Sequence, residues 1–325
     1  CCVLNGGIET QSDSILNAQG VPTMALPPYR VDYSPIIDRP PIKWPNDARV
    51  ALWVAPNVEH YEYLPALDGQ TNPWPRTPHP DTQQYSYRDY GNRVGFWRML
   101  EVLDAHSIRC CVSLNLAVLE HFPEVAEAMV ARDWDFMSHG IYNTEFINTW
   151  SEQRERAWYQ DSIDTLRRHT GKQLKGMFGP AGFSSENSPD LMAEAGLIYH
   201  SDWMHDDQPV PIKVKNGKMV SVPYSIEIND GLLFRQHFEG DYFLEICKAQ
   251  FDQLYEEGAE SGRVMCIAIH PYLLGQPHRI KYLDEALGYI MSHDGVWQTT
   301  ADDIAEHYIA NYYDQAVAHA EQFNK

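Results

Sequence analysis

Seven polar side chains with the chemistry of acids, bases and metal ligands each follow a short apolar run. They are Asn57, Glu59, His139, Asn143, Asp202, Asp206 and His270. Carboxylates, imidazoles and amides can move protons or hold a metal ion, whereas a solvated rim would show Lys, Ser and Thr as often. Glu59 lies two residues after Asn57, so both face the same side of an extended segment. The set predicts acid–base or metal-assisted chemistry, although each residue alone could be an ordinary turn residue.

The run from Arg263 to His270 is the clearest of these apolar segments. A run with so few polar residues is typical of a strand that is buried on both faces of a parallel sheet. Pro271 cannot donate a hydrogen bond to a neighbouring strand, so we expect the strand to end there. His270 is therefore expected at the carboxyl end of a parallel strand, where α/β folds place their functional residues.

Short apolar runs alternate with helical patterns along the rest of the chain. Strands are predicted at residues 49–55, 108–114, 134–137, 174–178, 197–201, 219–222, 263–269 and 296–299. This alternation predicts an α/β fold, a (β/α)7-8 barrel of distorted or incomplete form, with residues 46–325 as a single catalytic domain. Residues 1–45 are rich in Pro and lack periodicity, which predicts an extended N-terminal arm.

Three predicted helices have a recognisable N-terminal cap or a recognisable buried face. One covers residues 93–106. Its buried stripe would consist of Val94, Trp97, Leu100 and Leu103. Thr149 and Glu152 form the capping box of a second helix that runs to His169, and Thr300 with Asp303 caps the last helix, which runs to about Ala320.

Charge and composition narrow the classes of partner. The chain has 25 Lys and Arg against 45 Asp and Glu, a net charge of -20, which argues against nucleic acid and anionic membrane surfaces. No apolar run approaches the ~20 residues of a membrane-spanning helix. The first residues lack the pattern of a secretory signal, and the sequence does not begin with Met. The six cysteines have neither disulfide-framework nor zinc-site spacing, so a reducing cytoplasm is the expected location.

Seven segments spread over most of residues 46–310 carry a family pattern. They are Val54–Glu59, Tyr90–Arg98, Ser138–Gly140, Tyr199–Pro209, Pro223–Asp230, Ile269–Arg279 and Trp297–His307. The chain resembles the polysaccharide deacetylase (NodB-homology) superfamily, and within it the branch of metal-independent-type allantoinases and cyclic imide hydrolases. The resemblance implies a hydrolase that acts on a non-peptide C–N bond of a small-molecule amide, ureide or imide, and it suggests homotetramers.

The sequence departs from the deacetylase pattern at the metal-binding positions. Deacetylases of this superfamily carry two aspartates after the first strand and a His-x-x-x-His motif after the third. Here the corresponding residues are Asn57, Glu59, His139 and Asn143. A divalent metal such as Zn held by Glu59, His139 and Asn143 stays open, but a metal-free site is favoured because an amide oxygen is a weak zinc ligand.

The implied reaction is attack of water on an amide carbonyl, which needs a base, an oxyanion stabiliser and an acid for the leaving nitrogen. His270 is the expected acid–base residue because imidazole titrates near neutral pH. Asp202 or Asp206 would orient His270. Glu59 would activate the water if no metal is present, and Asn57 completes the expected catalytic set.

Substrate contacts are expected from further residues that follow the predicted strands. These are Arg88, Tyr142, Asn143, Trp203, Glu227 and Asn229. Arg88 would neutralise an anionic group of the substrate, although it could equally form a surface ion pair. Two other functions stay open: a metal-dependent deacetylase of an N-acetylated sugar, and a catalytically inactive barrel that binds a ligand.

Overall fold

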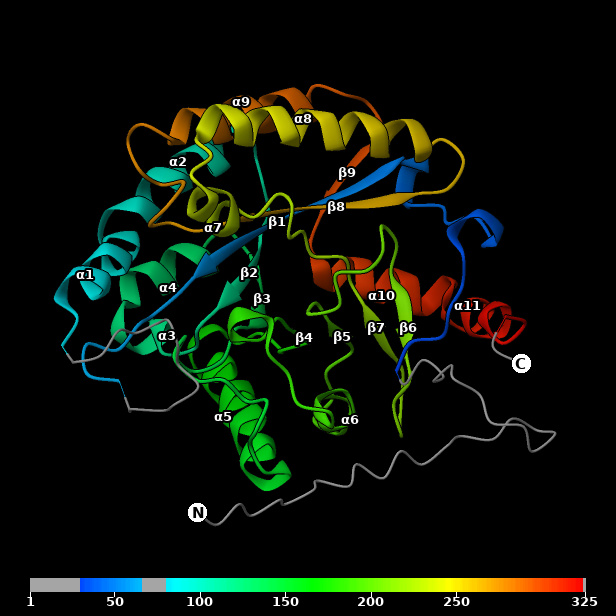
Figure 1. Cartoon of the computed structure of the whole chain (residues 1–325), viewed down its shortest axis with the longest axis horizontal. Coiled ribbons are helices and arrows are strands. Elements are labelled where there is room, and N and C mark those ends of the chain that lie inside the picture. Colours follow the sequence, from blue (N-terminus) through cyan, green and yellow to red (C-terminus); the bar gives the residue numbers. More distant parts are fainter. Residues whose placement is uncertain (1–29, 66–79, 324–325) are drawn as a thin grey trace, which may run out of the picture.

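The computed structural model describes residues 30–65 and 80–323, and its centre is a curled, mostly parallel sheet (Figure 1). Its strands are β1 (Val50–Val58), β2 (Cys111–Leu114), β3 (Asp135–Ser138), β4 (Gly176–Met177), β5 (Tyr199–His200), β6 (Val210–Ile212), β7 (Met219–Ser221), β8 (Arg263–Ile269) and β9 (Val296–Thr299). Their order in space is β6-β7-β5-β4-β3-β2-β1-β8, with β9 also paired to β1. Only β6, which the sequence did not reveal, pairs antiparallel among these strands. The predicted distorted α/β barrel is confirmed.

Helices cover the outer face of the sheet. They are α1 (Thr82–Tyr90), α2 (Phe96–Ala105), α3 (Val118–His121), α4 (Pro123–Val130), α5 (Glu152–Thr170), α6 (Ser188–Glu194), α7 (Asp230–Leu233), α8 (Gly240–Glu257), α9 (Ile280–Met291), α10 (Ala301–Asn311) and α11 (Tyr313–Ala320). In Figure 1, α8 and α9 lie side by side across the top of the sheet. None of the helices in the described ranges combines the length and apolarity that crossing a bilayer requires.

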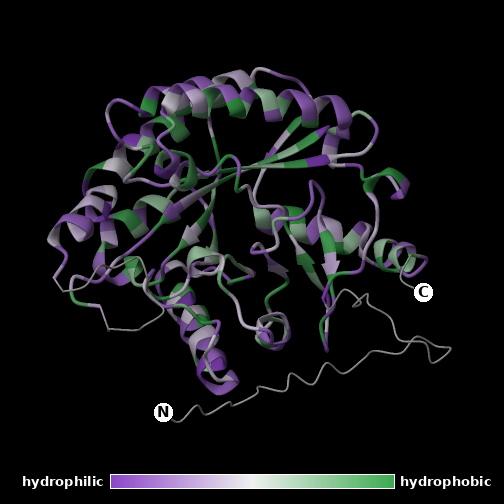
Figure 2. Ribbon diagram, viewed as in Figure 1, coloured by the Kyte–Doolittle hydropathy of each residue, from purple (hydrophilic) through white to green (hydrophobic). Residues whose placement is uncertain are grey.

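Strand β1 is buried along its whole length, and its two faces have different neighbours. Leu52 and Val54 pack in a cluster with side chains of the outer helices, whereas Ala51, Trp53 and Ala55 pack inside the barrel. Side chains alternate along a strand, so residues 57 and 59 continue the interior face. Figure 2 shows the resulting apolar strands beneath helices with polar outer faces. The period of two is therefore what brings polar side chains to the interior at the carboxyl end.

The edge of β8 that faces away from β1 is hydrogen-bonded by segments without regular secondary structure, and not by a further strand. The Val264 amide donates to the Asp207 carbonyl at 2.9 Å, and the Ala268 amide donates to the Ile228 carbonyl at 3.1 Å. These bonds satisfy backbone groups that an open sheet edge would leave unpaired. The segment that ends at Asn229 is thereby fixed against β8, immediately before α7.

The predicted helix over residues 93–106 corresponds to α2 and the end of the turn before it. A π-helical turn at Gly91–Gly95 joins α2 to α1. Because that turn shifts the helical register, the predicted stripe is partly wrong: Val94 and Trp97 are 39% and 38% exposed. The turn packs against the chain that follows β8. A Cβ atom at Gly95 would lie only 1.9 Å from the Pro271 carbonyl oxygen, so glycine permits this approach.

Two helix starts test the predicted caps. The hydroxyl of Thr300 accepts a hydrogen bond from the Asp303 amide, as expected. At α5 the cap is Ser151, which accepts from the Arg154 amide, so the prediction of Thr149 is wrong. Serine two residues later takes the role because the helix begins at Glu152 and leaves Thr149 outside its first turn.

Residues 30–49 pack on the barrel, while residues 1–29 of the predicted arm lie outside the described residues. Trp44 is buried, and its indole Nε1 donates to the Arg263 carbonyl at 2.9 Å. Arg39 pairs with Asp206 at 2.6 Å. This part of the arm therefore fixes the strand β8 and the chain that follows β5.

Candidate functional site

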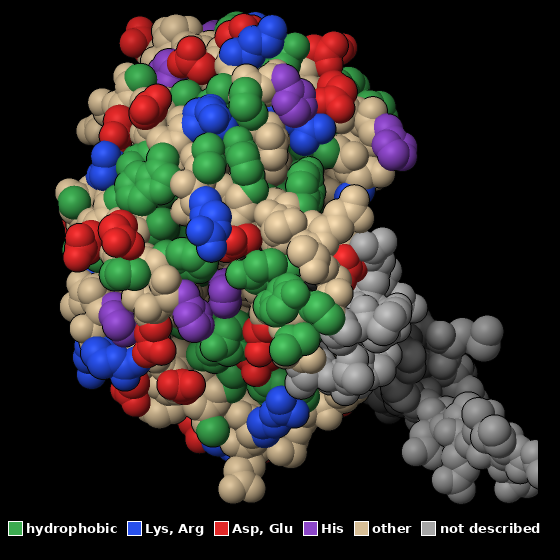
Figure 3. Space-filling view, turned by 90° about the vertical axis from the view of Figure 1, so that its left-hand side faces the viewer, with side chains coloured by type: hydrophobic (Ala, Val, Ile, Leu, Met, Phe, Trp, Pro, Cys, Tyr) green, Lys and Arg blue, Asp and Glu red, His purple; other side chains and the backbone are tan. Residues whose placement is uncertain are grey.

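A pocket of about 700 Å³ opens at the carboxyl ends of the strands. Its lining comprises Asn57, Glu59, Tyr61, Gln84, Arg88, His139, Asn143, Phe146, Phe178, Ala181, Phe183, Met204, Ile226, Asn229, Gly231, Leu232, Arg235, His270 and Tyr272. The carboxyl ends of β1 and β8 point to the left in Figure 1, and Figure 3 faces that side. Hydrophobic, basic and His side chains gather there.

Three of the predicted residues meet at the bottom of this pocket. Oε1 of Glu59 lies 3.5 Å from Nε2 of His139 and 3.4 Å from Nε2 of His270. All three side chains are buried, with residue exposures of 8%, 2% and 8% for Glu59, His139 and His270. One carboxylate oxygen, from the residue that follows β1, therefore lies between two imidazoles from the residues that follow β3 and β8.

The partner that orients His270 is Asp230. Oδ1 of Asp230 lies 2.6 Å from Nδ1 of His270, and Oδ2 accepts from the backbone amides of His270 and Leu274 at 2.9 and 3.2 Å. The expectation that Asp202 or Asp206 orients His270 is wrong.

The two aspartates expected in that role have other partners. Asp202 lies 2.9 Å from Nε2 of His200 and accepts from the Gly179 amide. Asp206 is held by Arg39. Neither lines the pocket, since each is held by the partners just named.

Electrostatics make Glu59 and His270 an ion pair. Burial alone would raise the pKa of Glu59, but the charge of His270 and its hydrogen bond to Glu59 hold that pKa well below its usual range. Burial alone would lower the pKa of His270, yet Asp230 and Glu59 raise it to about 10. At neutral pH His270 is therefore a charged proton donor and Glu59 a charged proton acceptor.

His139 presents a lone pair to the same space. Its Nδ1 lies 2.7 Å from the Phe178 carbonyl oxygen, and since a carbonyl only accepts, Nδ1 carries the proton. In the neutral ring Nε2 is then an acceptor directed at Glu59. A water molecule that donates to both of these atoms from the pocket side would be polarised for the loss of a proton.

The other oxygen of Glu59 is held by a side chain that sequence reasoning missed. The Tyr61 hydroxyl donates to Oε2 at 2.9 Å, and Nδ2 of Asn143 donates in turn to the Tyr61 oxygen. Asn92, from the π-helical turn, donates to the Glu59 carbonyl at 2.8 Å. The Tyr-Gly-Asn-Arg segment thus fixes the backbone of Glu59, which no local pattern shows.

The remaining predicted residues divide into two groups. Asn57, Arg88 and Asn229 line the pocket, although the Asn57 amide is engaged with the Tyr224 hydroxyl at 2.9 Å. Arg88 lies over the Tyr61 ring, with its guanidinium 4.6 Å from the ring centroid.

The other group does not line the pocket and corrects the predicted substrate contacts. Tyr142 lies beside the rings of His60 and His121, and the Trp203 indole donates to Nδ1 of His200. Glu227 is exposed and lines a different pocket. A position directly after a strand predicts that a residue lies at the carboxyl end of the barrel. The path of each loop then decides whether its side chain faces the pocket.

The side chains in this pocket fit a divalent metal poorly. Within residues 30–65 and 80–323, no three or more His, Cys, Asp and Glu side chains are placed to hold an ion. His270 is protonated and fixed to Asp230, and the Asn143 amide nitrogen is bound to Tyr61. That leaves Glu59 and His139 as the two donors that zinc prefers, one fewer than its catalytic sites use.

Asp230, which is buried behind His270, and Arg235, which lines the pocket, are the residues that sequence reasoning overlooked with most consequence. Both belong to the short segment of α7 and the turn after it, which is separated from β7 by irregular chain. The signal that could have revealed Asp230 is its neighbour: Asn229 caps α7 by accepting from the Gly231 amide. An Asn-Asp-Gly sequence after an apolar run is a helix start, and a helix start can carry an inward carboxylate.

Comparison with known proteins finds relatives both by sequence and by structure. The sequence model of the polysaccharide deacetylase family matches residues 79–200, which include His139 and Asn143. A Schizosaccharomyces pombe protein that bears the name of this family is 27% identical over 299 residues, or 83% of this chain and 93% of that protein.

Two solved structures are similar over most of their length. A probable polysaccharide deacetylase from Pseudomonas aeruginosa is 29% identical, with a TM-score of 0.76 over 84% of this chain and 95% of that chain. The PuuE allantoinase is 30% identical, with a TM-score of 0.75 over 85% of this chain and 95% of that chain.

Proposed function

The chain belongs to the polysaccharide deacetylase family, whose members are hydrolases of C–N bonds other than peptide bonds, and on that premise we propose that it hydrolyses a small amide, ureide or cyclic imide. The observation that carries the proposal is the Glu59 carboxylate between two imidazole Nε2 atoms, at 3.5 and 3.4 Å, in a pocket of about 700 Å³. Such a pocket suits a small molecule better than a polymer chain.

The proposed reaction moves two protons. Glu59, with His139 as second acceptor, takes a proton from water as the water oxygen bonds to the substrate carbonyl carbon. The charged imidazole of His270 then gives its Nε2 proton to the leaving nitrogen as the C–N bond breaks. Asp230 stabilises the imidazolium before that transfer and fixes its orientation. The Tyr61 hydroxyl, which donates to Glu59 before the reaction, is the neutral donor that we propose for the oxyanion that forms in between.

The similarity to PuuE allantoinase and the polar side chains that line the pocket support a ureide or an imide as the class of substrate. We propose that Glu59 acts as base without a metal ion, because Glu59 and His139 alone make a poor zinc site. Where a metal did bind, Glu59, His139 and Asn143 would hold it, and the ion would acidify a water molecule.

A metal-dependent deacetylase of an N-acetylated sugar is the second candidate. One observation favours it: His139 is fixed through Nδ1 with Nε2 directed inward, the orientation that metal-binding histidines adopt. The family that matches residues 79–200 also bears that name.

The test is a substrate panel with purified protein. Allantoin, succinimide, hydantoin and chitin oligosaccharides are incubated with enzyme before and after treatment with a chelator, and ring opening or acetate release is measured. We expect ring opening of a ureide or imide that survives chelation. Acetate release that chelation abolishes would replace the proposal by the second candidate, and binding without turnover across the panel would indicate an inactive ligand-binding barrel.

Assembly and location complete the proposal. We propose a homo-oligomer, a tetramer as in the related branch, with exposed Tyr33, Trp97 and Phe238 as candidate contact residues. A cytoplasmic location agrees with four buried free thiols in the described chain, Cys110, Cys111, Cys247 and Cys266.

A further inference from the structure

We infer that Arg235 is the specificity residue of the pocket and that it binds a carboxylate on the substrate. The inference deepens the proposed function and rests on it: the substrate would be a small cyclic amide or ureide that carries a carboxylate away from the bond that breaks. The argument uses the position of Arg235, its charge environment and the other walls of the pocket.

Arg235 lines the same pocket as Glu59 and His270, and it is exposed. Across residues 30–65 and 80–323, no ion pair or hydrogen bond of its guanidinium is found. Most other arginines have carboxylate partners, for example Arg263 with Glu257 and Arg279 with Glu239. In a chain with net charge -20, a guanidinium that faces a pocket without a carboxylate partner is an open anion site.

The segment that carries Arg235 is fixed at both ends. The Asp230 carboxylate ties its start to His270 and Leu274, as described above. Its end turns back through bonds from the His237 amide to the Phe234 carbonyl and from the Phe238 amide to the Leu233 carbonyl. The group that orients the proton donor and the group that would bind the substrate therefore lie on one short segment, so a substrate bound to Arg235 is positioned relative to His270.

The other charges of the pocket also favour an anion. Glu59 is the one acidic residue in its described lining, and that carboxylate is already paired with His270. Arg88 is part-buried, with Tyr61 and Tyr272 beneath its guanidinium at 4.6 and 5.5 Å and Gln84 Oε1 at 2.7 Å. Arg88 thus has a fixed place in the wall, whereas Arg235 offers its planar fork to a ligand, a shape that matches a carboxylate.

The remaining wall is apolar and suits a flat ring. Phe146 and Phe183 contact each other edge to face at 5.3 Å, and Ile226 and Leu232 also line the pocket. A planar ring against these side chains would leave its polar substituents directed toward the charged groups. The pocket therefore combines apolar side chains, the acid–base pair of Glu59 and His270, and the guanidinium of Arg235, which has no carboxylate partner in the described chain.

The test compares two ligands of equal shape and different charge, hydantoin-5-acetate and hydantoin-5-acetamide. Binding of each is measured by calorimetry, and ring opening by kcat/KM, for the wild type, Arg235→Ala, Arg235→Lys and the control Arg156→Ala. Arg156 is an exposed arginine of α5 that pairs with Glu152 and Glu194 and does not line the pocket. We expect the wild type to prefer the acetate, and Arg235→Ala to reduce that preference by roughly 10- to 100-fold. Arg235→Lys should restore part of it, and Arg156→Ala should leave it unchanged.

Equal affinity of the wild type for both ligands, no detectable binding of either, or an unchanged preference in Arg235→Ala would overturn the inference. Failure of the proposed function gives a different result. If the acetate binds through Arg235 but neither ring is opened while other substrates of the panel are also inert, the carboxylate site stands and the hydrolytic reaction does not.

Discussion

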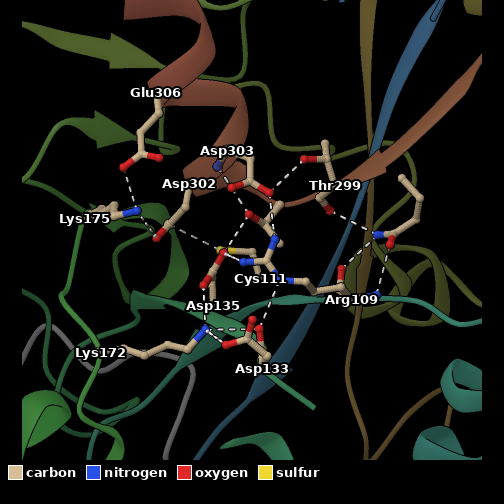
Figure 4. Close-up of polar contacts among 12 residues, drawn as sticks. Arg109, Cys111, Asp133, Asp135, Lys172, Lys175, Thr299, Asp302, Asp303 and Glu306 are labelled. Atoms are coloured by element: carbon tan, nitrogen blue, oxygen red, sulfur yellow. Dashed lines mark hydrogen bonds and ion pairs between the residues drawn. The ribbon is translucent and has the colours of Figure 1, made fainter. Parts of the chain in front are cut away.

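The two ends of the barrel both bury carboxylates, but they give them different partners. At the carboxyl end, Glu59 and Asp230 face imidazoles beside an open pocket. At the amino end, shown in Figure 4, the carboxylates of β3 and α10 face lysines and arginines. Arg109 contacts Asp135 and Asp303.

The amino end is a closed network. Lys172 bonds to Asp133 and Asp135, and Lys175 to Asp302 and Glu306. Asp302 lies at the start of α10 (Figure 4). It is buried and accepts from the Tyr199 hydroxyl at 2.8 Å. Lysine and arginine keep their protons at neutral pH, so this network stabilises α10 against the barrel without proton transfer.

The comparison teaches which features separate a catalytic carboxylate from a structural one. Burial is common to Glu59 and Asp302, with exposures of 8% and 2%. The pKa of Glu59 is lowered because the charge of His270 outweighs burial, while burial and Asp135 raise the pKa of Asp302 to about 7. A partner that can release a proton, together with space for a substrate, marks the carboxyl end as the chemical one.

Removing either member of the catalytic ion pair is the largest expected effect. In His270→Ala or Glu59→Gln, kcat should fall by about 10²–10⁴-fold, the usual contribution of general acid–base catalysis. Steady-state kinetics on the substrate found in the panel would measure it, with circular dichroism to confirm folding. Asp302→Asn, at the other end of the barrel, is the matched control and should keep full activity. Undiminished turnover in either catalytic variant would remove that residue from the mechanism.

Asp230→Asn sharpens the comparison by changing a neighbour of the proton donor. Asp230 raises the pKa of His270, which reaches about 10, so the wild type should lose activity only as the pH rises through that value. Without the Asp230 charge, His270 loses its proton at lower pH. We expect kcat to fall roughly 10- to 100-fold and the alkaline limb of the pH–rate profile to move to lower pH.

The pH profile is the decisive readout for Asp230. A purely structural role would reduce activity and leave the alkaline limb in place, and that outcome would contradict the assignment of Asp230 as the positioning residue of His270.

Asp302→Asn tests the structural end and has the smallest expected effect. The pKa of Asp302 is about 7 in the folded chain and 3.8 in its ordinary state, so the folded state holds the proton more tightly. The stability from this proton is complete below about pH 4 and is lost as the pH rises through about 7. Asparagine has no charge to bury, so the variant should exceed the wild type in unfolding free energy by on the order of 1–3 kcal/mol at alkaline pH.

Urea unfolding of both proteins at about pH 4 and about pH 8 checks this sign. The difference should vanish at the acid value. An equal difference at both pH values would mean that Asp302 is not the titrating group, and that packing of the asparagine accounts for the change.

Local patterns predicted the barrel and three of the central residues. Apolar runs with a stop at Pro271 placed β8 and His270, and the spacing of two placed Asn57 and Glu59 on one face. His139 followed from the end of β3. These predictions need only residues within one strand, which is why a single sequence sufficed.

The partners of those residues could not be predicted in the same way. Asp230 is 40 residues from His270 in sequence, and Asp206 is 167 residues from Arg39. Which aspartate orients His270 depends on how the chain between β7 and α8 closes against the edge of β8. No periodicity records that path, so the sequence does not distinguish Asp230 from Asp202 or Asp206 as the partner of His270.

The sequence by itself determined the barrel, the end at which its chemistry would lie, and the presence there of Glu59, His139 and His270, since strand period and strand ends are local properties. Only the tertiary structure decided that Asp230 fixes His270, that Tyr61 and Asn92 fix Glu59, and that Arg235 faces the pocket. Most of those contacts join segments that are far apart in the sequence. They depend on how the loops pack on the barrel, which local propensity does not specify.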